Sequence, residues 1–233
     1  SDDLQTWRQA SGRAAEGLAL HKDDVYGDRW FWAPEVYCIN GAFYMFFSAQ
    51  SHVCVAVSDS PLGPFVQKEK KPMIEGEKCI DNTLFIDDDG QAYLCWGNTQ
   101  CYYAKLKKNM IELDGPIIPI NLPRYTEAPW IHKRGDWYYL SYASEFPEKI
   151  CYAMSRSIEG PWEYKGILNE LAGNSNTNHQ AIIEFKGDWY FIYHNGSINT
   201  AGGSFRRAVC IDRLYYNEDG TMKRIQMTTE GVQ

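Results

Sequence analysis

Four copies of one hairpin pattern constrain the fold of this chain more than any other feature of its sequence. Each copy has two runs of β-branched and aromatic residues separated by a short turn with glycine, which is the pattern of a β-hairpin. The turn glycines are Gly41, Gly90, Gly135 and Gly187, so the copies follow one another at steps of 49, 45 and 52 residues. A repeat of about 50 residues made of short strands is typical of a β-propeller, in which each repeat forms one blade.

Further strands are expected after the hairpins. Residues 53–57 alternate as in a strand and run into a Ser-Pro-Leu-Gly-Pro turn. Residues 150–154 repeat this pattern, and residues 101–106 form a weaker copy. Each blade is therefore predicted to hold a hairpin, a third strand and an outer edge strand.

The length of 233 residues corresponds to just under five repeats, yet four inner hairpins are visible. A chain of this size can bury one full core. We therefore expect a single all-β domain, a five-bladed β-propeller with an incomplete first blade. Residues 1–30 are assigned to the remnant of that blade, and the four further blades are expected at 31–77, 78–125, 126–177 and 178–233.

Composition argues against several classes of function. The net charge of -7 disfavours nucleic-acid binding, which needs concentrated Lys and Arg. No apolar run approaches the roughly 20 residues of a membrane-spanning helix. The acidic start Ser1-Asp2-Asp3 is unlike a secretion signal, and the compartment stays open between secreted or periplasmic and cytoplasmic.

The cysteines do not indicate a zinc site. There are seven, an odd number, and none forms a CxxC pair. Most stand inside apolar strand patterns, where a thiol behaves as a small hydrophobic group. We expect buried free thiols rather than disulfides.

One position of the repeat carries ionisable side chains. Counting back eight or nine residues from each turn glycine leads to Ala33, Asp81, Glu127 and His179. This is the start of the innermost strand, which lines the central funnel of a propeller, so three ionisable groups are expected to point to one axis. A single such residue is most often a polar cap of a loop, whereas three in register favour a functional site.

Two carboxylates across a funnel suggest glycoside hydrolysis. One acid protonates the leaving oxygen, and a second carboxylate activates water or attacks the sugar. Glu127 stands beside Pro129 and Trp130, and apolar neighbours favour the raised pKa that a general acid needs. Asp81 is suited to tune that acid or to orient the sugar. His179 is expected either to bind a metal or a water on the axis or to form a structural hydrogen bond.

Six segments resemble glycoside hydrolase family 43, whose members are five-bladed propellers acting on arabinose- and xylose-containing polysaccharides. They span nearly the whole chain in the family's order. The segments are WAPEV at 32–36, VAVSDSPLGPF at 55–65, IDNTLFIDDDG at 80–90, TEAPW at 126–130, NHQAII at 178–183 and RRAVCID at 206–212.

The resemblance implies roles for several residues. Glu127 corresponds to the general acid, and Asp81 to the aspartate that modulates the pKa of that acid and positions the sugar. His179 corresponds to a histidine over an axial calcium or a water cluster, so the resemblance leaves a structural calcium and a water cluster as alternatives, and no cofactor is required. Arg206 or Arg207 corresponds to an arginine reaching toward the catalytic pocket, and on a strand only one of two neighbours can face inward.

Trp32 and Phe31 correspond to aromatic positions near the sugar subsite, although plain packing within the blades explains them equally well.

Two motifs depart from the family. Its acidic-Gly-Pro motif reads Glu127-Ala128-Pro129, and its Ile-Asp-Pro motif reads Ile80-Asp81-Asn82. Neither change removes a carboxylate. The acidic hairpin tip at 87–89 is expected to be a solvated turn rather than a calcium loop.

The general base of the family has no counterpart here. It is an aspartate in an Asp-Pro context on the innermost strand of the first blade, and no Asp-Pro pair occurs in this chain. The opening Ser1–Trp7 resembles the end of that blade. Asp23, Asp24 and Asp28 stand in a loop before Trp32 and are not assigned as the base.

Two hypotheses for function follow. The first is an inverting glycoside hydrolase acting on α-L-arabinofuranosyl or β-D-xylosyl linkages of plant cell-wall polysaccharides. The alternative is a non-catalytic carbohydrate-binding propeller, or an inactive fragment, because the base is missing. A second copy or a partner segment is expected to complete the first blade, so the chain alone should be oligomeric or poorly active.

Overall fold

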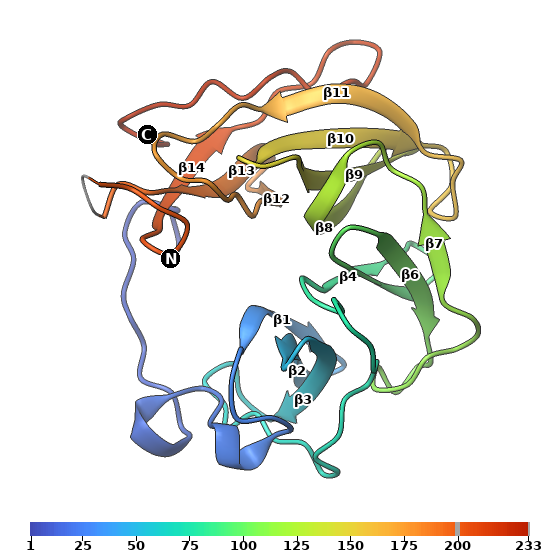
Figure 1. Cartoon of the computed structure of the whole chain (residues 1–233), viewed down its shortest axis with the longest axis vertical. Coiled ribbons are helices and arrows are strands. Elements are labelled where there is room, and N and C mark those ends of the chain that lie inside the picture. Colours follow the sequence, from blue (N-terminus) through green and yellow to red (C-terminus); the bar gives the residue numbers. More distant parts are fainter. Residues whose placement is uncertain (199–200, 233) are drawn as a thin grey trace. The chain divides into compact units, whose positions relative to one another are not determined.

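A computed structural model describes residues 1–198 and 201–232, and it shows a chain made mainly of β-strands and loops (Figure 1). Within these residues, fourteen strands form four antiparallel sheets. Residues 1–31 contain two 3-10 helices, η1 (Ala15–Gly17) and η2 (Lys22–Asp24), and no strand. None of the described helices is long and apolar enough to cross a membrane.

Contacts group the chain into two compact units, and the first contains residues 6–98 and 102–119. Its first sheet is a meander of β1 (Trp32–Ile39), β2 (Ala42–Ala49) and β3 (His52–Ser58). The second sheet has the order β4 (Thr83–Ile86), β5 (Ala92–Trp96), β6 (Cys101–Leu106) and β7 (Ile118–Ile120). The two sheets bury one common core, which includes Phe46 and Val55 from the first sheet and Leu94 and Trp96 from the second.

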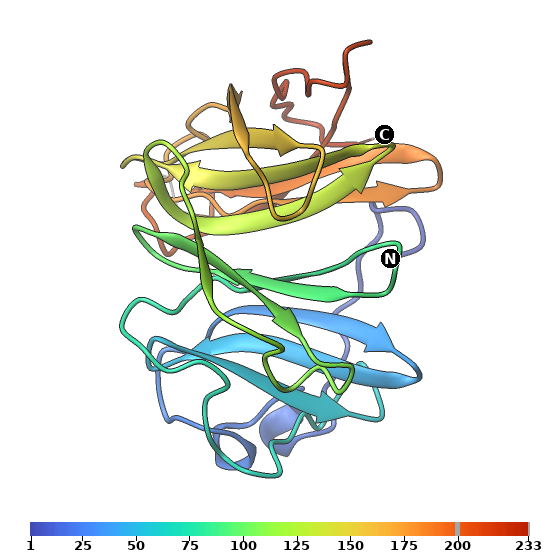
Figure 2. The same ribbon diagram turned by 90° about the vertical axis from the view of Figure 1, so that its right-hand side faces the viewer.

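The second unit contains most of the chain after residue 119. One sheet has the order β11-β10-β9-β8, formed by β8 (Tyr125–Arg134), β9 (Trp137–Ser144), β10 (Lys149–Ser155) and β11 (Glu163–Asn169). The other sheet is β12 (Ala181–Phe185), β13 (Asp188–Asn195) and β14 (Ala208–Arg213). The turned view shows the β8–β9 hairpin running beside the β12–β13 hairpin (Figure 2). The expected division into one domain with five blades stays a prediction.

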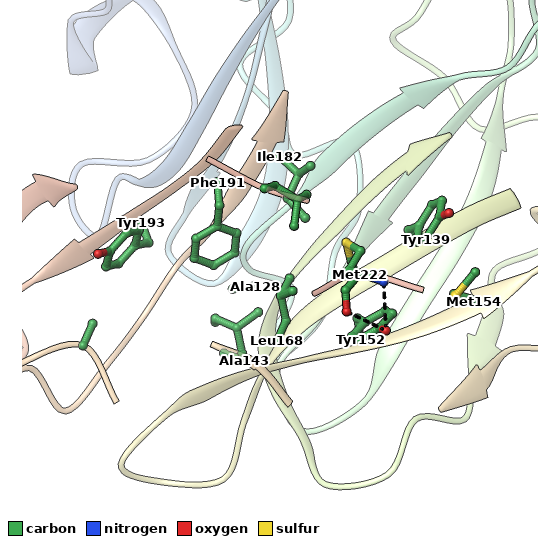
Figure 3. Packing of buried hydrophobic residues seen from close by; sticks show 13 residues of the cluster. Ala128, Tyr139, Ala143, Tyr152, Met154, Leu168, Ile182, Phe191, Tyr193 and Met222 are labelled. Carbon is green, nitrogen blue, oxygen red and sulfur yellow. Dashed lines mark hydrogen bonds between the residues drawn. The ribbon is translucent and has the colours of Figure 1, made fainter. Parts of the chain in front are cut away.

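The core of the second unit lies between its two sheets (Figure 3). Ala128 on β8 and Phe191 on β13 are both fully buried in it. The C-terminal segment closes this core, because the hydroxyl of Tyr152 lies 3.1 Å from the backbone nitrogen of Met222 and accepts its hydrogen bond. Burial of aromatic and aliphatic side chains on both faces is what stacked sheets require.

The predicted hairpins are confirmed, and their turns explain two of the repeated glycines. β1 and β2 are joined by Asn40-Gly41 with φ of 51° and 82°, and β12 and β13 by Lys186-Gly187 with φ of 55° and 87°. Two positive φ angles define the turn whose twist matches paired strands, and glycine adopts them without strain.

All seven cysteines are free, as predicted. Cys54, Cys95, Cys101 and Cys151 are buried, but the expectation of burial is wrong for Cys38, which is exposed. Residues of β1 alternate between exposed and half-buried, and Cys38 stands on the exposed face.

Candidate active site

Asp81 lies in the first unit, two residues before β4, and it is buried with 6% of its surface exposed. Its φ of 55° is unusual for a residue with a side chain and marks a position where the backbone is held in a special conformation. The two residues before Asp81 are fixed by backbone hydrogen bonds. The backbone nitrogen of Cys79 donates to the carbonyl oxygen of Ser51 at 3.1 Å, and that of Gly97 to Ile80 at 2.9 Å.

Glu35 on β1 is a second carboxyl group in this region, and the sequence analysis did not assign it. The Tyr37 hydroxyl lies 2.7 Å from its Oε2 atom. Burial raises the pKa of Glu35 to about 7; its hydrogen bonds with Tyr37 and Leu84 act in the opposite direction, and the charge of Asp81 raises it further. The signal in the sequence was an acidic residue on the strand face that also carries Tyr37 and Ile39, the half-buried face of β1.

The two aromatic residues predicted near a sugar differ in their surroundings. Trp32 is 43% exposed and stacks on Trp30, with ring centroids 5.9 Å apart and planes at 14°. Phe31 instead packs at the edge of the hydrophobic cluster around Phe47, with centroids 6.0 Å apart. The packing interpretation therefore suits Phe31, whereas Trp32 presents an open face.

Glu127 lies in the second unit, on β8, and is half-buried. The pairing of β8 with β9 shifts twice around it, between Tyr125 and Glu127 and again between Glu127 and Trp130. Such bulges turn side chains away from the regular alternation of a strand. Ala128 has φ of 54°, which accounts for the glycine that the family carries at this place, because glycine adopts such angles freely.

His179 lies just before β12, and its surroundings are those of a neutral imidazole. Burial lowers the pKa of His179 to about 4. The charge of Glu127 acts to raise this pKa, and the charge of Arg207 lowers it further. These electrostatic effects place Glu127, His179 and Arg207 in one neighbourhood of the second unit. A neutral imidazole offers one lone pair and one donor at neutral pH.

His194 on β13 belongs to the same neighbourhood and was not found from the sequence. Burial lowers its pKa to about 4, and the charges of Arg207 and His179 lower it further. Both of its ring nitrogens are buried without a hydrogen-bond partner in the described protein. In the sequence it is one histidine in an apolar strand, a pattern that a structural core histidine gives equally well.

The prediction that Arg206 and Arg207 stand on a strand is wrong, because β14 begins only at Ala208. Arg207 is held in the preceding loop, where its Nε donates to the carbonyl oxygen of Ser204 at 2.7 Å and its Nη2 to Oγ1 of Thr177 at 3.5 Å. Arg207 is also the arginine whose charge acts on both histidines. Arg206 and Arg207 are both exposed.

The residues present do not fit a protein-held calcium. Calcium takes about six to eight oxygen ligands, whereas His179 offers a nitrogen. Among the described residues there is no group of three or more His, Cys, Asp or Glu arranged to hold a metal ion. The neutral His179 is better suited to a water molecule, and we derive no chemical step through a metal.

Comparisons with known proteins show the family of this chain. The model of the family described as glycosyl hydrolases family 43 matches residues 1–222. A xylosidase/arabinosidase of Bacteroides ovatus is 30% identical, over 90% of this chain and 78% of that protein. These matches confirm the predicted resemblance.

Solved structures support the same family and the fold class. An α-L-arabinofuranosidase of Clostridium thermocellum matches with a TM-score of 0.84 and 34% identity, over 100% of this chain and 83% of that chain. A family 43 enzyme of Xanthomonas citri, solved with xylose, matches with a TM-score of 0.82 and 30% identity, over 92% of this chain and 78% of that chain. Together with the four antiparallel sheets, they confirm the predicted all-β propeller class.

Proposed function

Because this chain belongs to the glycosyl hydrolases family 43, we propose that it is an inverting glycosidase for α-L-arabinofuranosyl or β-D-xylosyl linkages of plant cell-wall polysaccharides. The observation that supports this most is the setting of Glu127 at a double bulge of β8, with His179 and Arg207 in its electrostatic neighbourhood. The names of the relatives, a xylosidase/arabinosidase and an α-L-arabinofuranosidase, support a pentose as the sugar that is released. They favour the hydrolase over the non-catalytic alternative.

In the proposed reaction, Glu127 donates a proton to the oxygen of the leaving group, and Asp81 positions the sugar and tunes that acid. An inverting hydrolase also needs a carboxylate that activates water on the opposite face of the sugar ring. The chain has no Asp-Pro pair, the context of the family's base. We propose that the base comes from outside these 233 residues, on a longer form of the chain or on a partner segment.

Trp32 and Arg207 are proposed to contact the substrate. The open face of Trp32 suits the apolar face of a sugar, and Arg207 carries donors suited to hydroxyl oxygens. For Phe31 and Arg206 a direct sugar contact has less support. Phe31 packs in a hydrophobic cluster, and Arg207, not Arg206, is the arginine whose charge acts on the two histidines. His179 is proposed to hold a water, and the reaction needs no cofactor.

Proton NMR of the hydrolysis of xylotriose and of arabinoxylan tests this function. Inverting hydrolysis gives the product sugar with the anomeric configuration opposite to that of the cleaved bond, before mutarotation mixes the forms. Treatment with EDTA should leave the rate unchanged. A retained anomer, or binding of xylotriose with no product by a form of the protein that also carries the missing first-blade segment, would overturn the proposal.

A further inference from the structure

The hydroxyl of Tyr37 lies in short contact with two oxygen atoms. It is 2.7 Å from Oε2 of Glu35 and 2.9 Å from the carbonyl oxygen of Leu84. The backbone nitrogen of Leu84 is also 3.4 Å from the same Glu35 oxygen. Glu35 and Tyr37 belong to β1 and Leu84 to β4, so this cluster connects the two sheets of the first unit.

Counting hydrogens decides the protonation state that satisfies this cluster. A phenol hydroxyl has one hydrogen to donate, and a carbonyl oxygen and an ionised carboxylate only accept. With an ionised Glu35, the single hydrogen of Tyr37 can stand in only one of its two short oxygen–oxygen contacts, of 2.7 and 2.9 Å, and the other contact brings two oxygens together with no hydrogen between them. With a neutral Glu35, the carboxyl donates to Tyr37 and Tyr37 donates to Leu84, so both oxygens are satisfied. A close contact of two oxygens without a hydrogen between them is repulsive, so the neutral acid fits the geometry better.

We propose that Glu35 is a neutral carboxylic acid that positions Asp81, through the chain of hydrogen bonds from Glu35 to Tyr37 to Leu84. Asp81 stands three residues before Leu84 in the same segment, so the strand that Leu84 anchors also sets the place of Asp81. This role rests on the proposed function, in which Asp81 positions the sugar. Glu35 acts through Asp81 and is a positioning residue, not a group that contacts the substrate.

The electrostatics of the cluster agree with this assignment. Two titratable groups act on the carboxyl, Tyr37 from its own strand and Asp81 from the loop before β4. Burial raises the pKa of Glu35 to about 7. Burial and the nearby carboxyl raise the pKa of Tyr37 well above its usual value, so Tyr37 keeps its hydrogen. A neutral Glu35 also spares Asp81 a second negative charge nearby, whereas an ionised Glu35 opposes the charge of Asp81.

Glu35→Gln is the decisive variant, because its amide has the shape of the acid, keeps a donor toward Tyr37 and does not ionise. Infrared difference spectroscopy on the full chain should show a protonated carboxyl band in the wild type that disappears with a midpoint near pH 7. The band should be absent from Glu35→Gln and present in Glu77→Gln, which changes an exposed glutamate of the same unit. This readout needs no catalysis, so it separates a failure of this inference from a failure of the proposed function.

The positioning role is tested by the pH dependence of kcat/KM. Raising the pH to about 8, one unit above the midpoint, should lower kcat/KM of the wild type. This fall should be about tenfold larger than the fall for Glu35→Gln over the same pH range. Tyr37→Phe, which breaks the chain of hydrogen bonds, should lower kcat/KM about tenfold at every pH. If turnover is too low, xylotriose affinity replaces kcat/KM in the same comparison. The inference is overturned if the carboxyl band is unchanged in Glu35→Gln, or if wild type and Glu35→Gln follow parallel pH profiles.

Discussion

The side-chain amide of Gln180 donates a hydrogen bond to the carbonyl oxygen of Ala128 at 2.9 Å. Ala128 follows Glu127 on β8, and Gln180 follows His179, so one buried hydrogen bond joins the segments that carry the proposed acid and its histidine neighbour. The same amide nitrogen also donates to Oγ of Ser141 at 3.1 Å. The position of Glu127 relative to His179 is thus fixed by neighbouring side chains and not only by the strands.

Replacement of Gln180 by alanine should loosen this connection. The buried hydrogen bond from Gln180 to the carbonyl oxygen of Ala128 would be lost, and loss of such a bond costs about 1 kcal/mol of unfolding free energy. Urea denaturation measures this loss, and kcat should fall with it because Glu127 is no longer held in place. Gln91→Ala is the matched control, since Gln91 makes similar bonds in the other unit. Equal kcat losses in both variants would contradict a special role of Gln180.

Arg207 and its neighbour Arg206 give a matched pair of variants. The charge of Arg207 lowers the pKa of both His179 and His194, so Arg207→Gln should raise both pKa values toward the usual value. Arg206→Gln should leave them unchanged. NMR titration of the imidazole signals measures this difference. If the two variants behave alike, the structure assigns the wrong arginine to the site.

Buried neutral histidines should make the protein sensitive to acid. The pKa of His194 is lowered to about 4 in the folded state, below its usual value of about 6.5. The unfolded chain therefore binds the proton more tightly, and the free energy of unfolding falls as the pH drops from about 6.5 to about 4. The loss is on the order of 3 kcal/mol for this residue. His194→Gln should reduce this acid sensitivity, measured as the fall of the thermal unfolding temperature with falling pH. An unchanged slope of unfolding temperature against pH would contradict the burial of an unprotonated ring.

The sequence predicted the hairpins well because their signals are local. Each hairpin turn is specified by residues within that turn, as the positive φ angles at Gly41 and Gly187 show. The period is the spacing of these turns along the sequence, so no distant contact is needed to predict it. The family motifs likewise directed attention to Asp81 and Glu127. These are features that neighbouring residues specify together.

The parts that the sequence did not reveal depend on distant contacts. Glu35 escaped notice because a register shift between Trp32 and Glu35 separates it from the counted position, which falls on Ala33. Arg207 was expected on a strand, but its bonds to Ser204 and Thr177 hold it in the loop before β14. Ser204 belongs to the same loop, whereas Thr177 lies in a distant segment whose proximity only the fold establishes.

Hydrolysis of 4-nitrophenyl α-L-arabinofuranoside and 4-nitrophenyl β-D-xyloside by wild type and Glu127→Gln tests the account most directly. With xylotriose or arabinoxylan, whose poor leaving groups need protonation, kcat should fall by about 10²–10⁴ in Glu127→Gln, and the loss should be smaller for the activated aryl substrates. Glu184→Gln, a change on the exposed surface of β12, should keep wild-type rates on all substrates. Activity of Glu127→Gln equal to wild type on xylotriose would contradict the assignment of Glu127 as the general acid.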